Sequence, residues 1–298
     1  ALFEGGPDTA KALTQLPLNH IFFTGSSRVG QLVYEAAAKQ LIPVTLELGG
    51  KNPVWMDETA DVSTTVRRLF WSKALNAGQT CLAPNLLMAP LALKENIVEA
   101  WNACCKDRFG GSLDLAEDLG SIVNSAHFDR LHAFLTQGKP LTKLEVESKT
   151  RRILPVLLEV EMEPSEEVFG PILPVQWYVP EEFDSRWKAM EAQTRKEGPL
   201  AAYLFSKSKA KKRAFSYGIR SGGACINDTT LQFTVSDAPF GGVGNSGMGA
   251  YHGRYGFEAF SHMRTVVSRK FFFDLPGRFN PGAFPEAWIK KIIAFLMH

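Results

Sequence analysis

Hydrophobic and polar residues alternate along the chain in blocks whose lengths suit strands and helices. Residues 20–25 form a short apolar run that predicts a buried strand, and residues 42–48 predict a second one. Between them, apolar side chains recur every three or four positions, which predicts a helix after a Gly-Ser turn. Strand, helix and strand in this order predict a βαβ unit with parallel strands and a right-handed crossover.

The same alternation continues over most of the chain. An acidic, threonine-rich lead-in at residues 57–65 opens a helix that runs towards Asn76, and a second helix covers about residues 93–109. The apolar stripe predicted for this second helix consists of Ile97, Trp101, Cys104 and Arg108. Further strands are expected at 152–160, 171–178, 198–206 and 222–227, with helices from about 181 and at 211–219. This order favours an α/β fold with a mostly parallel sheet.

Composition excludes several classes of protein. The chain has 298 residues, 45% of them hydrophobic, and a net charge of +2, which is ordinary for a globular protein. No basic run interleaved with aromatic residues predicts a nucleic-acid partner, and the basic cluster at 207–213 is interpreted as a solvated helix face. No apolar stretch approaches about 20 residues and no signal-peptide pattern opens the chain. Because the chain begins with alanine, a processed or truncated start is expected.

Four cysteines are too few for a disulfide framework, and their spacing to one another and to histidine predicts no metal site. A reducing, cytoplasmic location is the natural interpretation. Cys81 differs from the other three because Gly78 and Pro84 flank it, which predicts a turn after a helix that presents the thiol. A free thiol is mostly protonated near neutral pH, so a nucleophile usually needs surroundings that lower its pKa. On composition alone an inert Cys81 is favoured, with a Cys-His hydrolase as a further alternative.

Glu47 ends a hydrophobic strand immediately before two glycines. The carboxyl end of a parallel strand is where ligand crevices of α/β proteins open, and partial desolvation there raises the pKa of a carboxyl towards that of a general base. The structural alternative is an ion pair with Lys51 or Arg67. The turn from Gly25 to Gly30 opens a helix whose N-terminus favours a pyrophosphate, although its spacing is not the dinucleotide fingerprint. Seven glycines among residues 239–256 predict an ordered loop that approaches another group closely.

Five segments occur in the order found in aldehyde dehydrogenases: "FTGSSRVG", "LELGGKNP", "NAGQTCLAPN", "EEVFGPILP" and "PFGGVGNSGMGAYHG". From about residue 20 to 262 the chain resembles this family, most closely its class 3 or fatty-aldehyde branch. The resemblance implies an α/β aldehyde dehydrogenase-like fold, in which residues 1–46 are the remnant of a Rossmann-type NAD(P)-binding domain. Residues 47–255 would be the catalytic domain, and residues 256–298 a C-terminal oligomerisation segment and tail of a homodimer.

By this resemblance, the chain oxidises aldehydes, medium- or long-chain aliphatic or aromatic, to carboxylic acids with NAD or NADP. The Cys81 thiolate would attack the aldehyde to give a thiohemiacetal, which passes hydride to the nicotinamide and becomes a thioester. Glu47 would activate the water that hydrolyses this thioester. Glu167 would hold the nicotinamide ribose hydroxyls, Phe169 would position the nicotinamide, and Asn227 and Phe240 would line the substrate pocket. The residues matching the cofactor loop are Gly25, Ser26, Ser27, Arg28, Val29 and Gly30.

The chain departs from the family at its N-terminus. Two family elements have no match before His20: the asparagine of the oxyanion hole and the Lys-Pro-Ser segment that grips the adenosine ribose. A catalytically silent fragment or structural subunit is therefore an alternative, and a thiol hydrolase without cofactor is a third. The last 13 residues, "EAWIKKIIAFLMH", are too short to span a bilayer. They predict an amphipathic helix that lies on a membrane surface or packs on the protein or a partner subunit.

Overall fold

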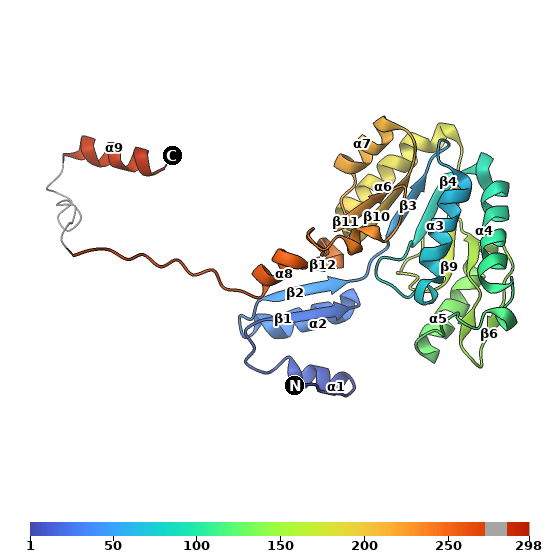
Figure 1. The fold of residues 1–298 in the computed structure, drawn as a ribbon, viewed down its shortest axis with the longest axis horizontal. Coiled ribbons are helices and arrows are strands. Elements are labelled where there is room, and N and C mark those ends of the chain that lie inside the picture. The colour runs from blue at the N-terminus through green and yellow to red at the C-terminus, as the bar shows by residue number, and fades with distance from the viewer. Residues whose placement is uncertain (272–284, 298) are drawn as a thin grey trace. The chain divides into compact units, whose positions relative to one another are not determined.

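The computed structural model describes residues 1–271 and 285–297, which form two compact units, Ala1–Ser261 and His262–His298. Each unit is described by itself. The first contains two main β-sheets and the helices that pack on them (Figure 1). The second contains an extended segment and one helix, α9 (Glu286–Leu296).

The smaller sheet has three strands in the order β1-β2-β12. Its strands are β1 (Ile21–Gly25), β2 (Val44–Leu48) and β12 (Gly247–Met248). The helices at the N-terminal end of the chain are α1 (Pro7–Leu13) and α2 (Ser27–Ala38). β1 and β2 run parallel, as predicted for the βαβ unit, and β12 pairs antiparallel with β2 so that Gly247 lies opposite Glu47. Val33 and Ala37 of α2 pack with Leu46 and Leu48 of β2, which explains the apolar periodicity of the helix.

The larger sheet has seven strands in the order β11-β10-β3-β4-β9-β8-β5. Its strands are β3 (Pro53–Met56), β4 (Leu86–Pro90), β5 (Lys139–Pro140), β8 (Val156–Glu159), β9 (Ile172–Tyr178), β10 (Ala201–Phe205) and β11 (Gly223–Ile226). All neighbouring strands pair in parallel except β5 and β8. The predicted, mostly parallel α/β sheet is confirmed. A separate two-stranded ribbon consists of β6 (Val146–Glu147) and β7 (Arg152–Ile153).

Helices cover both faces of this sheet. They are α3 (Val62–Ala74), α4 (Lys94–Phe109), α5 (Ser125–Phe134), α6 (Phe183–Glu197), α7 (Lys209–Gly218) and, beyond the sheet, α8 (Gly253–Ala259). Val54 and Met56 of β3 pack in the cluster that contains residues of α3 and α4, whereas Trp55 between them packs with residues of α6 and α7. Because successive strand side chains point to opposite faces, the two helix pairs lie on opposite sides of the sheet (Figure 1).

One predicted stripe is half wrong. The buried positions of α4 are Ile97, Trp101, Cys105 and Phe109, not Cys104 and Arg108. Both aromatic rings pack on Phe70 of α3: the centroid of the Phe70 ring lies 6.0 Å from that of Phe109 and 5.1 Å from that of Trp101. Contact with α3 therefore turns the helix by about one residue from the predicted orientation.

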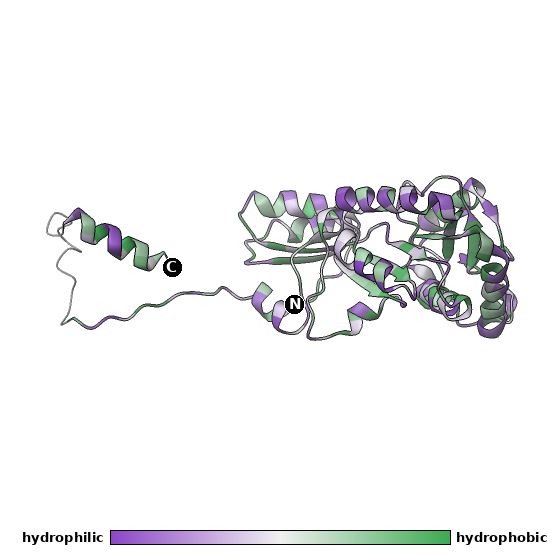
Figure 2. Cartoon of the chain, turned by 90° about the horizontal axis from the view of Figure 1, so that it is seen from above, coloured by the Kyte–Doolittle hydropathy of each residue, from purple (hydrophilic) through white to green (hydrophobic). Residues whose placement is uncertain are grey.

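Polar and apolar side chains share the terminal helix α9 (Figure 2). Trp288 and Phe295 are exposed, and Lys290 pairs with Glu286 one turn earlier at 2.7 Å. Within the described residues, no helix combines the length and apolar character needed to cross a bilayer.

Candidate active site

Cys81 follows a tight turn at the end of α3. The helix ends at Ala74, and Asn76, Ala77 and Gly78 then adopt positive φ angles of 50°, 52° and 68°. A side chain at Gly78 would overlap the carbonyl oxygen of Gly170, so glycine is required there by space as well as by φ. This turn leaves Cys81 half-buried, as its flanking residues predicted.

A fully buried asparagine, Asn52, fixes the backbone around the cysteine. Its Nδ2 donates to the carbonyls of Cys81 at 2.7 Å and Ala83 at 3.1 Å, while its Oδ1 accepts from the N–H of Ala201 at 2.8 Å. Asn52 immediately precedes β3, and Ala201 begins β10. The cysteine segment is thereby tied to the first residues of two neighbouring strands.

Glu47 is buried near the end of β2, where the residue is 2% exposed. Its Oε1 has no hydrogen-bond partner among the described residues. Burial raises its pKa to about 7, and hydrogen bonding by the Cys81 thiol works against this rise. The structural alternative of a pair with Lys51 is wrong, because Lys51 pairs with Glu163 at 3.2 Å and Glu197 at 2.9 Å. Glu47 is thus a buried carboxyl poised to titrate near neutral pH beside a thiol.

The Cys81 thiol itself is held in its neutral form. Burial raises its pKa to about 12, and the negative charges of Glu47 and Glu167 add to the rise. Its own backbone N–H acts in the opposite direction. Many reactive cysteines have a nearby positive charge that lowers the pKa of the thiol. Among the described residues, no positive charge contributes to the pKa of Cys81.

Glu167 lies over the glycine pair that follows β2. Its carboxylate occupies the space that a side chain at Gly49 would fill, and it accepts a hydrogen bond from the N–H of Gly50. Burial raises the pKa of Glu167 to about 7, the Gly50 N–H and the charges of Lys73 and Arg130 oppose that rise, and Glu47 adds to it. Two carboxyls predicted from distant motifs therefore lie near one another and near Cys81.

The backbone after Glu167 is held from two sides. Arg130 of α5 donates to the carbonyls of Glu167 at 3.1 Å and Val168 at 2.7 Å. The Val168 N–H donates to Oδ1 of Asn85 at 2.7 Å. These contacts support a positive φ of 45° at Phe169, whose ring centroid lies 6.0 Å from that of His127.

The predicted cofactor loop opens α2. Ser26 is the N-cap residue, and its Oγ accepts from the N–H of Val29 at 3.4 Å. Ser27 is engaged elsewhere, because its hydroxyl donates to the carbonyl of Asn245 at 2.8 Å. A side chain at Gly30 would come within 2.6 Å of Leu48, so this glycine serves the packing of α2 on β2.

The loop is accessible to a ligand. Arg28 and Val29 are exposed, and the first N–H groups of a helix have no acceptor within it. The N-terminus of a helix attracts anions, so this one fits a phosphate group. Gly25 at the end of β1 faces the Phe23 ring, which lies 2.6 Å from where its side chain would begin.

An aromatic cluster reaches towards Cys81 and Glu47 through Tyr251. Phe240 is buried, with ring centroids of Phe233, Tyr251 and His252 at 5.2, 5.4 and 5.2 Å. Burial raises the pKa of Tyr251, and the charges of Glu47 and Cys81 raise it further, so the phenol lies within electrostatic reach of both. Phe240 accordingly belongs to an aromatic wall that is linked to Cys81 through Tyr251.

Asn227 is placed differently. Its Oδ1 accepts from the N–H of Ser206 at 2.7 Å, just beyond the end of β10, whereas Asn52 and the cysteine segment are tied to the beginning of that strand at Ala201. The structure does not bring the Asn227 side chain to Cys81. Its amide instead ties the end of β10 to the segment after β11.

Comparisons with known proteins identify the family to which the chain is similar. The aldehyde dehydrogenase family model matches residues 1–266. The chain is 41% identical over 273 residues to human aldehyde dehydrogenase family 3 member B1, covering 90% of this chain and 57% of that protein. It is 39% identical over 268 residues to a rat aldehyde dehydrogenase named dimeric and NADP-preferring, covering 88% and 58%. A structure of Staphylococcus aureus AldH in its substrate-bound state matches with a TM-score of 0.90 and 34% identity, over 98% of this chain and 64% of that one.

The chain belongs to the aldehyde dehydrogenase family. The resemblance seen in the five segments, including its class 3 character, is confirmed. The chain spans somewhat more than half the length of the curated relatives it matches.

Several residues that shape this aldehyde dehydrogenase site were not predicted. Asn52, Asn85 and Arg130 hold the backbone of the two key segments, and Lys73 is fully buried behind them. The sequence carried one signal, since Lys73 follows Val66 and Leu69 on the apolar face of α3.

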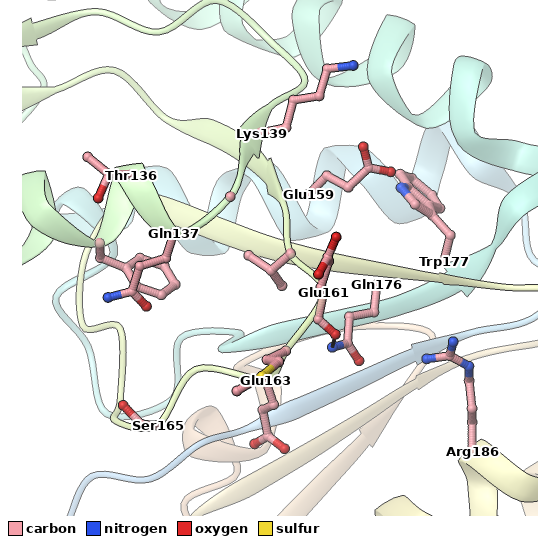
Figure 3. A pocket seen from close by; sticks show the side chains of 14 residues that line it. Thr136, Gln137, Lys139, Glu159, Glu161, Glu163, Ser165, Gln176, Trp177 and Arg186 are labelled. Atoms are coloured by element: carbon pink, nitrogen blue, oxygen red, sulfur yellow. Dashed lines mark hydrogen bonds between the residues drawn. The ribbon is translucent and has the colours of Figure 1, made fainter.

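A pocket of about 1030 Å³ lies apart from the residues predicted for catalysis (Figure 3). Its lining is charged in both signs, with Glu159, Glu161, Glu163, Lys139 and Arg186 among its side chains. None of the predicted catalytic, cofactor or substrate residues lines it. The pocket is therefore not taken as the active site.

Proposed function

We propose that the chain carries the covalent chemistry of an NAD(P)-dependent aldehyde dehydrogenase, with Cys81 as nucleophile and Glu47 as general base. The observation that supports this most is the buried Glu47 carboxyl, whose pKa is raised to about 7 beside the Cys81 thiol. A base with a pKa near the working pH is both deprotonated in part and basic enough to accept a proton.

The chain's residues act in two stages. Cys81 loses its proton to Glu47 or to water, and its sulfur forms a bond to the aldehyde carbon, giving a thiohemiacetal. The Cys81 N–H, which already acts on the thiol, would donate a hydrogen bond to the developing oxyanion. After oxidation to the thioester, Glu47 removes a proton from water, the water oxygen attacks the carbonyl carbon, and the C–S bond breaks to release the acid and the thiolate.

NAD or NADP is the cofactor that this proposal requires. The residues present fit one, because the N-terminus of α2 at Ser26 is exposed to a phosphate and the Glu167 carboxylate lies over Gly49 and Gly50. When bound, the nicotinamide supplies the hydride acceptor. Glu167 would hold the ribose hydroxyls, and Phe169, its backbone fixed by Arg130, would orient the ring. A related rat enzyme is named NADP-preferring, which supports NADP, and a related Mycobacterium tuberculosis enzyme was solved in complex with NAD+, which supports NAD.

The substrate class follows from the wall beside Cys81. Tyr251 lies within electrostatic reach of the thiol, its ring packs on that of Phe240, and Phe240 packs on Phe233. This aromatic surface favours aliphatic or aromatic aldehydes over charged ones. Asn227 has a scaffold role in this proposal instead of the pocket role predicted from the sequence.

The decisive experiment traps the aldehyde on the cysteine. The chain is incubated with NAD(P) and decanal or benzaldehyde, and the adduct mass at Cys81 is measured alongside NAD(P)H absorbance at 340 nm. We expect an acyl adduct that accumulates in Glu47→Gln and is absent in Cys81→Ser. Modification spread evenly over Cys81, Cys104 and Cys225 would favour a silent structural subunit, and ester hydrolysis without nucleotide would favour a thiol hydrolase.

We further propose an organisation with residues 1–46 contributing to the cofactor domain, 47–255 to the catalytic domain and 256–298 to a C-terminal segment. A homodimer is supported by a relative named dimeric. Light scattering on the purified chain, with and without residues 256–298, tests whether this segment is needed for the dimer.

The exposed apolar and basic side chains of α9, Trp288 and Phe295 with Lys290 and Lys291, support contact with an anionic membrane surface. Cosedimentation with vesicles of phosphatidylcholine and phosphatidylserine tests this, with Trp288→Ser as the weakened variant. Four free cysteines support a reducing, cytoplasmic location, which fractionation of expressing cells would examine.

A further inference from the structure

Lys73 is a buried charged side chain that the chemistry described so far does not use. It lies in the last turn of α3 and is 0% exposed, on the face that carries Val66 and Leu69. Its Nζ donates to the carbonyl of Pro84 at 3.1 Å. An ammonium group has three donors, so one neutral acceptor in a fully buried position leaves most of its charge without compensation.

The compensating charge belongs to Glu167. Burial lowers the pKa of Lys73 to about 7, and among the described residues Glu167 is the group whose charge opposes this fall. In the other direction, Lys73 and Arg130 favour the ionised Glu167 carboxyl while Glu47 disfavours it. Arg130 also donates a hydrogen bond to the backbone carbonyl of Glu167. Lys73 instead donates to Pro84, in the segment that carries Cys81, and acts on Glu167 by its charge.

The position of Lys73 connects two segments that the proposed reaction needs. Pro84 lies three residues after Cys81, and the next residue, Asn85, holds the N–H of Val168. The ammonium group of Lys73 is thus hydrogen-bonded to the segment that carries Cys81, and its charge acts on Glu167.

We propose that Lys73 is a positioning residue that holds the Cys81 segment through the Pro84 carbonyl and supplies a countercharge that favours the ionised form of the Glu167 carboxyl over Gly49. This inference rests on the proposed function, because the value of a fixed, ionised Glu167 lies in cofactor binding. Lys73 does not act on the Cys81 thiol directly; the charges that do are those of Glu47 and Glu167.

The test uses alkylation of Cys81 by iodoacetamide, followed by peptide mass spectrometry from pH 5.5 to 9.5. The full chain carries Glu47→Gln, so that among the described residues Glu167 is the remaining carboxyl whose charge acts on this thiol. Ionisation of Glu167 makes the thiol harder to deprotonate, so the rate profile should change slope near pH 7. With Lys73→Met added, the break should move up by about one pH unit, because an opposite charge has been removed.

Two further variants separate charge from packing. Leu69→Ala loosens the same helix without removing a charge and should leave the break in place, whereas Lys73→Gln keeps a donor for Pro84 and should still move it. A break at the same pH in Lys73→Met and Lys73→Gln as in the parent would overturn the proposal, as would an equal shift in Leu69→Ala. Aldehyde trapping on the unsubstituted chain tests the proposed function separately from this result.

Discussion

Asn52 makes the sharpest stability prediction because one buried side chain fixes three backbone groups. It donates to the carbonyls of Cys81 and Ala83 and accepts from the N–H of Ala201. The contacts with Ala83 and Ala201 are buried, and the contact with Cys81 is partly buried. In Asn52→Ala all three backbone groups lose their partner without gaining free access to water.

The magnitude follows from these environments. Leaving a buried backbone group unsatisfied costs about 1–3 kcal/mol, and a partly buried one less, so the loss should total about 3–5 kcal/mol of unfolding free energy. Asn52→Asp keeps the acceptor for Ala201 but sets a carboxylate against two carbonyl oxygens, so its loss should be comparable. A typical domain has only about 5–15 kcal/mol to lose, so the effect is large.

The assay is urea unfolding followed by tryptophan fluorescence, with Asn102→Ala as the matched control. Asn102 is an exposed asparagine on α4, and its removal should change the unfolding free energy by less than about 0.5 kcal/mol. Iodoacetamide should also reach Cys81 faster in Asn52→Ala, since the segment that carries it is released. A loss below about 1 kcal/mol would show that this network does not hold the cysteine segment as described.

Three further predictions concern the turn, the base and the Glu167 segment. Gly78→Ala should cost more than about 2 kcal/mol, because its side chain meets the Gly170 carbonyl at a positive φ; Gly120→Ala, which meets no atom within 4 Å, should cost little in the same urea assay. Because the pKa of Glu47 is raised to about 7, the folded state holds this proton more tightly than the unfolded state does. As the pH rises from 4.5 to 7.5, the unfolding free energy of the wild type should therefore fall by about 2–3 kcal/mol relative to that of Glu47→Gln. Parallel curves of stability against pH would contradict this. Arg130→Leu should free two carbonyls and speed hydrogen exchange across residues 167–170 at least tenfold, whereas an unchanged rate would mean that Asn85 alone suffices.

The chain order of strands and helices could be predicted because periodicity is a local property of the sequence. The apolar run before Gly25 and the alternation that follows it place β1, α2 and β2 where the structure has them. The orientation of α4 could not be predicted in the same way. Positions 104 and 105 both follow Ile97 and Trp101 at helical spacing, and only packing against Phe70 decides which one faces inward.

For the site, the chemical groups could be read from the sequence, but their supports could not. Cys81, Glu47 and Glu167 stand in distinctive segments, and the structure brings all three together. Asn52 and Arg130 act by bonding to backbone carbonyls far away in the chain, and a sequence does not show which carbonyls will lie opposite them. The partners of such residues exist only once the strands have paired.

The site also carries unusual backbone angles, close to the residues that these supports hold. Of the eight described non-glycine residues with positive φ, Asn76 and Ala77 precede Cys81 and Phe169 follows Glu167. Each such angle costs about 1–3 kcal/mol and persists only where surrounding contacts fix it. The contacts differ between the two segments: Asn76 exchanges hydrogen bonds with Gln79, and Ala77 is buried in the apolar core. Asn52 holds the carbonyl of Cys81 itself, and Arg130 holds the carbonyls of Glu167 and Val168. Substitutions of these two residues should therefore disturb the geometry of the site and the stability of the fold together, while truncation of an apolar core residue such as Leu69 should reduce stability and leave Cys81 reactivity in the folded state unchanged.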